Sequence, residues 1–182
     1  MPKAKLVDAT VLFADLLGYS RLGRTMDPLA LSELMNKLYA AVTPAIERAG
    51  GVVDKFIGDS VMAHFGAFKR LKDGPARAVK AAQALQVATR AFRAKAGHSL
   101  QFCVGIATGP VAAGSLGSGR AARPTVIGTT ANNAALLSML RTPDGVMLDR
   151  ATHDAVQRTV KTRPLAPLRY ANFEIEVHQV TG

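Results

Sequence analysis

The sequence contains little cysteine, few aromatic residues and no long apolar run. Cys103 is the only cysteine among 182 residues, which excludes an intrachain disulfide and a zinc site made of several thiolates. Aromatic residues make up 5% of the chain, so few side chains are available to stack on nucleic-acid bases. No segment approaches the roughly 20 apolar residues of a transmembrane helix, and the N-terminus lacks the pattern of a secretory signal. We therefore expect a cytoplasmic protein without a membrane segment.

Acidic residues are also scarce, because 23 Lys and Arg outnumber 13 Asp and Glu and give a net charge of +10. Such a charge is compatible with a nucleic-acid-binding module. The basic residues are scattered, however, and between residues 70 and 95 they follow one polar helix face without interleaved aromatic residues. We favour a solvated basic surface that also suits a small polyanion, with no nucleic-acid partner. A hydrophobic content of 48% indicates one globular domain over residues 1–182.

Hydrophobic periodicity predicts an alternation of strands and helices along the chain. The first six predicted elements are a strand over 6–14, a helix over 28–49 kinked at Pro44, strands over 52–56 and 61–65 joined by a tight turn, a helix from about 73, and a strand over 100–107. This β-α-β-β-α-β order predicts a ferredoxin-like α+β fold. A flexible arm or long loop is expected over 109–123. A C-terminal extension follows, with strands over 124–127, 146–148 and 173–180 and helices over 129–140 and 151–157.

Two aspartates are candidate metal ligands. Asp15 ends the first predicted strand, and Asp59 lies in the turn of the predicted hairpin. The first strand of a β-α-β-β unit lies beside that hairpin, so the two carboxylates can converge and bind hard divalent cations. Alternatively, Asp15 caps a helix and Asp59 only forms the turn. Lys55, four residues before Asp59, is either a surface lysine or a group that recognises a base or a phosphate.

The sequence around these residues resembles the catalytic domain of class III adenylyl and guanylyl cyclases of the bacterial type. The resemblance covers nearly the whole chain in order and rests on these segments: Val11-Leu12-Phe13-Ala14-Asp15-Leu16-Leu17-Gly18-Tyr19-Ser20, residues 50–66 (GGVVDKFIGDSVMAHFG), residues 104–111 (VGIATGPV), residues 125–128 (TVIG) and the C-terminal run that includes residues 163–165 and 177–180.

The resemblance implies a phosphoryl-transfer reaction that uses two divalent metal ions, Mg²⁺ or Mn²⁺. The ribose 3′-hydroxyl of the nucleotide attacks the α-phosphate, and pyrophosphate leaves. Asp15 and Asp59 would bind the metals with help from the Leu16 carbonyl. Backbone amides of residues 17–20, at the start of a helix, would face the phosphates.

The resemblance also implies a head-to-tail homodimer whose two chains share each active site. Lys55 and Thr125 match the pair that recognises the purine, and this combination favours ATP because lysine donates to adenine N1 while threonine accepts from the N6 amine. Asn132 matches the residue that orients the ribose. Arg169 stands where a phosphate-binding lysine is usual, and also supplies a positive charge.

Leu136 departs from the family pattern, which places an arginine at this position to stabilise charge at the α-phosphate. Loss of one such group typically lowers the rate by about 10²–10³. Arg120, Arg123 and Arg141 are candidate replacements. Three hypotheses remain open: an active adenylyl cyclase with a weakened site, a degenerate cyclase that binds nucleotide as a regulatory or scaffold dimer, and a basic nucleic-acid-binding module on the same fold.

Overall fold

The structure is a computed structural model and describes residues 4–119 and 122–181. Its elements, in chain order, are β1 (Lys5–Leu17), α1 (Tyr19–Thr25), α2 (Pro28–Arg48), β2 (Val52–Ile57), β3 (Ser60–Phe65), α3 (Gly74–Ala96), β4 (Gln101–Leu116), β5 (Arg123–Ile127), α4 (Thr129–Ser138), β6 (Val146–Leu148), α5 (Arg150–Val156), β7 (Thr162–Tyr170) and β8 (Phe173–Val180).

The strands form one sheet in the order β2-β3-β1-β4-β6-β8-β7, and β5 pairs with β4 beside this path. The first four positions are the strand order of a ferredoxin-like unit, with β1 antiparallel to both β3 and β4. Strand β6 extends the sheet parallel to β4. The predicted α+β architecture with a C-terminal extension is therefore confirmed.

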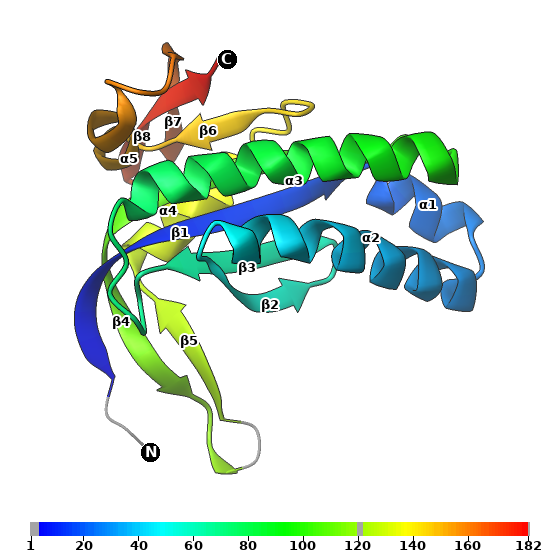
Figure 1. Cartoon of the computed structure of the whole chain (residues 1–182), viewed down its shortest axis with the longest axis horizontal. Coiled ribbons are helices and arrows are strands. Elements are labelled where there is room, and N and C mark those ends of the chain that lie inside the picture. The colour runs from blue at the N-terminus through cyan, green and yellow to red at the C-terminus, as the bar shows by residue number, and fades with distance from the viewer. Residues whose placement is uncertain (1–3, 120–121, 182) are drawn as a thin grey trace.

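Helices α2 and α3 lie side by side across one face of the sheet, as Figure 1 shows. Beneath them, the even-numbered residues Leu12, Ala14 and Leu16 of β1 belong to the main core. The odd-numbered residues Ala9 and Val11 pack on the other face, against α4. Because side chains alternate along a strand, Asp15 lies on this second face, away from α2 and α3.

The prediction of a loop over 109–123 is wrong. Strand β4 continues to Leu116 and turns back into β5, and the resulting hairpin projects from the body of the domain (Figure 1). Glycine and alanine indicated a loop because they have low strand propensity. Here small residues are needed for packing, since a Cβ on Gly114 would lie 2.7 Å from the Cα of Ala4. The arm is thus a paired strand with a closely approaching neighbour.

The end of β1 and the presence of β7 also differ from the predictions. Strand β1 continues through Asp15 to Leu17, because β4 pairs with it along its whole length. A short helix, α1, follows at once. Strand β7 was not predicted, since it contains Pro164 and Pro167. It is the edge strand of the sheet, where proline is tolerated because one side of the strand needs no hydrogen-bond donors.

The remaining elements agree with the sequence-based predictions to within a few residues. The turn at residues 58 and 59 joins β2 and β3, and Pro75 lies in the first turn of α3. Cys103 is buried in β4, which raises the pKa of its thiol. Across the described residues, none of the helices combines the length and the apolar character that crossing a bilayer requires.

Candidate active site

Asp15 and Asp59 lie at the same end of the sheet. Asp15 pairs with Ser60 in the β1–β3 ladder, and Asp59 is the residue directly before Ser60. The Ser60 hydroxyl donates to Asp15 Oδ1 at 2.9 Å, which fixes the orientation of that carboxylate. Both side chains are partly exposed, so solvent and a ligand can reach them. The structure therefore brings the two predicted metal ligands together.

The Asp59 carboxyl is partly buried and lies close to the charge of Asp15. Burial raises the pKa of the Asp59 carboxyl above its ordinary value of 3.8, and the negative charge of Asp15 raises it further. Burial, with the charge of Asp59 adding to it, also raises the pKa of the Tyr39 hydroxyl to about 12. This hydroxyl donates to the Gly58 carbonyl at 2.6 Å and so holds the turn that carries Asp59.

Arg141 supplies a positive charge to the pair. Its Nη1 atom lies 3.5 Å from Asp15 Oδ2, and the guanidinium lowers the pKa of Asp59 in opposition to burial. Arg141 has φ 53°, a left-handed conformation that is uncommon for a residue with a side chain. It lies in the loop after α4, whose backbone at residues 141 and 142 hydrogen-bonds Cys103, the β4 partner of Asp15.

Gly18 allows the chain to turn from β1 into α1. Its φ is 98°, and a Cβ there would lie 2.6 Å from the Ser99 carbonyl oxygen. Helix α1 consequently starts at Tyr19, only two residues after β1 ends at Leu17. Residues 17–20 thus form the turn from β1 into the first residues of α1, where the resemblance implies a helix start.

Lys55 and Thr125 meet at a second place, where β2 lies next to β5. The Lys55 ammonium donates to the Thr125 hydroxyl at 2.6 Å, although the residues are 70 positions apart. Asp54 completes the group: its Oδ1 lies 2.6 Å from Lys55 Nζ and accepts from the Thr125 hydroxyl at 2.9 Å. The Asp54 side chain is fully buried. Sequence reasoning predicted the Lys55–Thr125 pair and missed Asp54.

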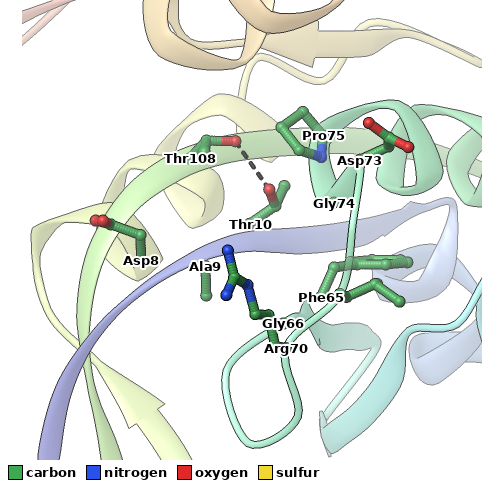
Figure 2. Close-up of a pocket in the computed structure, with 11 residues that line it drawn as sticks. Asp8, Ala9, Thr10, Phe65, Gly66, Arg70, Asp73, Gly74, Pro75 and Thr108 are labelled. Carbon is green, nitrogen blue, oxygen red and sulfur yellow. Dashed lines mark hydrogen bonds between the residues drawn. The ribbon is translucent and has the colours of Figure 1, made fainter.

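One pocket lies beside the Lys55–Thr125 pair, and another lies away from the predicted site residues. The first pocket has a volume of about 460 Å³. It is lined by the polar residues Asp54, Lys55, His64 and Arg123 and by apolar residues that include Phe68 and Pro124. Figure 2 shows a smaller pocket, of about 300 Å³, towards the N-terminal end of β1. There the Thr10 and Thr108 hydroxyls bond each other at 3.0 Å. Among the described residues that line this second pocket, none is a predicted site residue.

The other predicted site residues lie apart from these two groups. Asn132 is exposed in the first turn of α4, where its backbone N–H donates to the Gly128 carbonyl. Arg169 is on β7 and pairs with Glu174 at 3.0 Å, with 83% of its side chain exposed. Within the described chain, neither residue hydrogen-bonds Asp15, Asp59 or the Lys55–Thr125 pair. A single chain therefore does not assemble the complete predicted site.

Leu136 packs against apolar side chains. It packs against a buried cluster formed by Leu137, Met147, Ile175 and Val177, and Leu165 and Leu168 of β7 pack against the same cluster. Of the candidate replacement arginines, Arg141 is paired with Asp15, Arg123 donates to the Ala122 carbonyl, and Arg120 lies outside the described residues.

The chain is similar to several known proteins. Residues 1–176 match the sequence profile of the adenylate and guanylate cyclase catalytic domain. An adenylate cyclase of Anabaena cylindrica is 33% identical over an alignment of 140 positions that covers 72% of this chain and 27% of that protein. An uncharacterised protein of Mycobacterium tuberculosis is 35% identical over 130 residues, which are 71% of this chain and 23% of that protein.

The fold is also that of solved cyclase structures. The adenylyl cyclase CyaB from P. aeruginosa superimposes with a TM-score of 0.91 at 23% identity, and the match covers 100% of this chain and 97% of that one. The chain spans about a quarter of the length of the curated relatives it matches.

Proposed function

Because the chain belongs to the adenylate and guanylate cyclase catalytic domain family, we propose that it converts ATP to 3′,5′-cyclic AMP and pyrophosphate as a head-to-tail homodimer. The observation that best supports ATP as the substrate is the hydrogen bond of 2.6 Å between Lys55 and Thr125. The two side chains can present a donor and an acceptor to one purine edge. Adenine has the complementary pattern, with an acceptor at N1 and an amine donor at N6.

Asp15 and Asp59 would hold the divalent cations. Two carboxylates are the hard oxygen ligands that Mg²⁺ and Mn²⁺ prefer, and the β1–β3 pairing of Asp15 with Ser60 brings Asp15 next to the turn that carries Asp59. Groups of three or more His, Cys, Asp or Glu are absent from the described residues, so backbone carbonyls such as that of Leu16, phosphate oxygens and water would complete the coordination. Bound ions of this kind promote attack by a hydroxyl and neutralise a triphosphate.

The separation of the two groups supports a shared site. In a head-to-tail dimer, the carboxylates and the Gly18 turn of one chain would face the Lys55–Thr125 pair of the other. Each site would then contain Asn132 and Arg169 from the chain that supplies the purine pair; among the described residues, neither hydrogen-bonds Asp15 of its own chain. The new bond joins the ribose O3′ to the α-phosphorus, and the bond to the bridging oxygen breaks to release pyrophosphate.

The charge that develops at the α-phosphate needs a cation that Leu136 cannot supply. Arg141 is suited to supply part of it, since it already lies 3.5 Å from Asp15 and has 60% of its side chain exposed. It would act from the metal-binding chain, in contrast to the family arginine, which comes from the partner. We therefore expect turnover below that of a cyclase with an arginine at position 136.

The second candidate function is nucleotide binding without turnover, in a regulatory or scaffold dimer. One observation favours it: Leu136 is integrated into an apolar cluster with β7 and β8, so the position is used for packing. ATP binding that requires a divalent cation but gives no cyclic product would identify this function.

Complementation between two inactive variants tests the shared site. Asp59→Ala and Lys55→Ala should each abolish cyclic AMP formation, because each homodimer has the same defect in both sites. A 1:1 mixture re-equilibrated from monomers should recover about a quarter of the wild-type rate, since half of the dimers are mixed and each mixed dimer has one intact site. Asp59→Ala mixed with Asp15→Ala is the matched control and should recover nothing. Recovery in the control, or none in the test mixture, would contradict a shared site.

A further inference from the structure

We propose that Asp54 determines the preference of the purine-binding pair for adenine, by holding the Thr125 hydroxyl as a hydrogen-bond acceptor. This inference rests on the proposed function, because it assigns a base preference to the same site. Asp54 would be a positioning residue: it acts through Thr125 and does not itself touch the nucleotide.

A β-bulge places Asp54 on the same side of the strand as Lys55. In a regular strand, neighbouring side chains point to opposite faces. Here the β2–β3 register passes from Val53 opposite Ala63 to Lys55 opposite Met62, so Asp54 is an extra residue without a partner. Such a bulge redirects a side chain, and both Asp54 and Lys55 consequently reach Thr125.

The Asp54 carboxylate is surrounded by hydrogen-bond donors. Its Oδ1 accepts from the Thr125 hydroxyl at 2.9 Å and lies 2.6 Å from Lys55 Nζ, while its Oδ2 accepts from the Val126 backbone N–H at 3.3 Å. The side chain has no exposed surface. A buried carboxylate needs these partners, because leaving it unpaired in an apolar environment is costly. The direction of each hydrogen bond is therefore fixed, since an ionised carboxylate can only accept.

The hydrogens and lone pairs that remain define what the pair can bind. The hydroxyl of Thr125 has a single hydrogen, which it donates to Asp54, and one of its lone pairs receives Lys55. Thr125 can then offer a ligand only its second lone pair. Lys55 has three N–H groups, of which two are directed to Asp54 and Thr125 and the third to the Met62 sulfur at 3.9 Å. Thioether sulfur is a weak acceptor, so a ligand nitrogen can take its place and receive this third hydrogen bond. The pair thus presents one acceptor and one donor.

This arrangement discriminates between purines when the ribose and triphosphate hold the base in one orientation. The adenine N6 amine donates to Thr125 and adenine N1 accepts from Lys55. Guanine in the same orientation would place its O6 acceptor against the Thr125 lone pair and its N1–H donor against Lys55. Without Asp54, the Thr125 hydroxyl could rotate and donate to O6, which would remove one of the two mismatches.

The test measures binding of 3′-deoxy-ATP and 3′-deoxy-GTP, which lack the attacking hydroxyl, to the whole chain with Mn²⁺ by isothermal titration calorimetry. The wild type should prefer the adenine analogue. Asp54→Ala should lower the ratio of the two affinities by about tenfold or more, because one buried polar mismatch is relieved. Asp54→Leu is the second variant, since it fills a similar volume without an acceptor and should lower the ratio equally. Circular dichroism and gel filtration establish that each variant is folded.

A double-mutant cycle separates this role from a structural one. If Asp54 acts through the Thr125 hydroxyl, then adding Asp54→Ala to Thr125→Val should leave the affinity ratio of Thr125→Val unchanged. If Asp54→Ala lowers the affinity ratio of the Thr125→Val variant as much as it lowers that of the wild type, the inference is overturned. An unchanged affinity ratio in both Asp54 single variants would also overturn it. Either result leaves the proposed function intact. If the wild type binds neither analogue, the proposed function fails together with the inference. Equal binding of both analogues by the wild type would refute the adenine preference and the role of Asp54.

Discussion

Replacing Leu136 by arginine should increase the rate of cyclic AMP formation. In the proposed dimer this side chain would approach the α-phosphate bound by the partner chain, where charge develops during the reaction. One preorganised donor at such a place contributes about 10²–10³ in rate, which corresponds to roughly 2.7–4 kcal/mol. We expect Leu136→Arg to raise kcat by up to this factor, and by less if Arg141 already supplies part of the charge.

The change has a modest cost in stability. Leu136 is half-buried against the cluster that contains Ile175 and Val177. Complete burial of a leucine side chain is worth about 1.5–3 kcal/mol, and the aliphatic part of an arginine keeps some of the contact. A loss of about 1 kcal/mol is therefore expected, which a folded domain should tolerate.

The assay is the initial rate of cyclic AMP formation at saturating ATP and Mn²⁺, with Leu136→Gln as the matched control. Glutamine has a similar length and a hydrogen-bonding end but no positive charge, so it should not reproduce the gain. A folded, dimeric Leu136→Arg variant that is no faster than the wild type would refute the reasoning that position 136 faces the α-phosphate.

Three further predictions concern the metal-binding end of the sheet. At pH 7, Asp59→Asn should unfold at a slightly higher temperature than the wild type without metal. The raised pKa of Asp59 means that the folded state binds its proton more tightly, so the carboxylate lowers stability as the pH rises through the window above 3.8. Mn²⁺ at 100 times its Kd should stabilise the wild type by about 2.7 kcal/mol and the variant far less; a destabilised metal-free variant would contradict this. Arg141→Gln should raise the affinity for Mn²⁺, measured by calorimetry, by up to about fivefold, because an exposed ion pair that competes for Asp15 is worth at most about 1 kcal/mol; weaker binding would contradict it. Gly18→Ala should lower the free energy of unfolding by about 2 kcal/mol or more, and Gly58→Ala by about 1 kcal/mol, because both have positive φ but only the first would clash with a carbonyl; equal losses in urea titrations would show that the clash is unimportant.

The location of the carboxylate pair was predictable from the sequence because local rules agree there. Three features place Asp15 beside Asp59: the apolar strand sequence of β1, the short turn before Ser60 and the order of the strands and helices. The ferredoxin-like strand order follows from the same pattern.

Other features depend on tertiary contacts that no local pattern reveals. Strand β4 continues through a glycine-rich segment because β1 and Ala4 lie against it, and β7 accommodates two prolines because it is an edge strand. The role of Asp54 depends on a bulge, and a regular strand would have directed that side chain away from Lys55. Asp54 was visible in the sequence as a charged residue beside Lys55, but its burial was not.

The central claim is that this domain forms cyclic AMP from ATP at a site built on Asp15 and Asp59. The most direct test incubates the purified protein separately with ATP, GTP, CTP and UTP, with Mn²⁺ and with Mg²⁺, and quantifies the cyclic products beside an Asp59→Ala control. We predict cyclic AMP above the control and little product from the other nucleotides. No cyclic product from any nucleotide, with ATP still bound, would contradict the claim and identify a nucleotide-binding domain that does not catalyse.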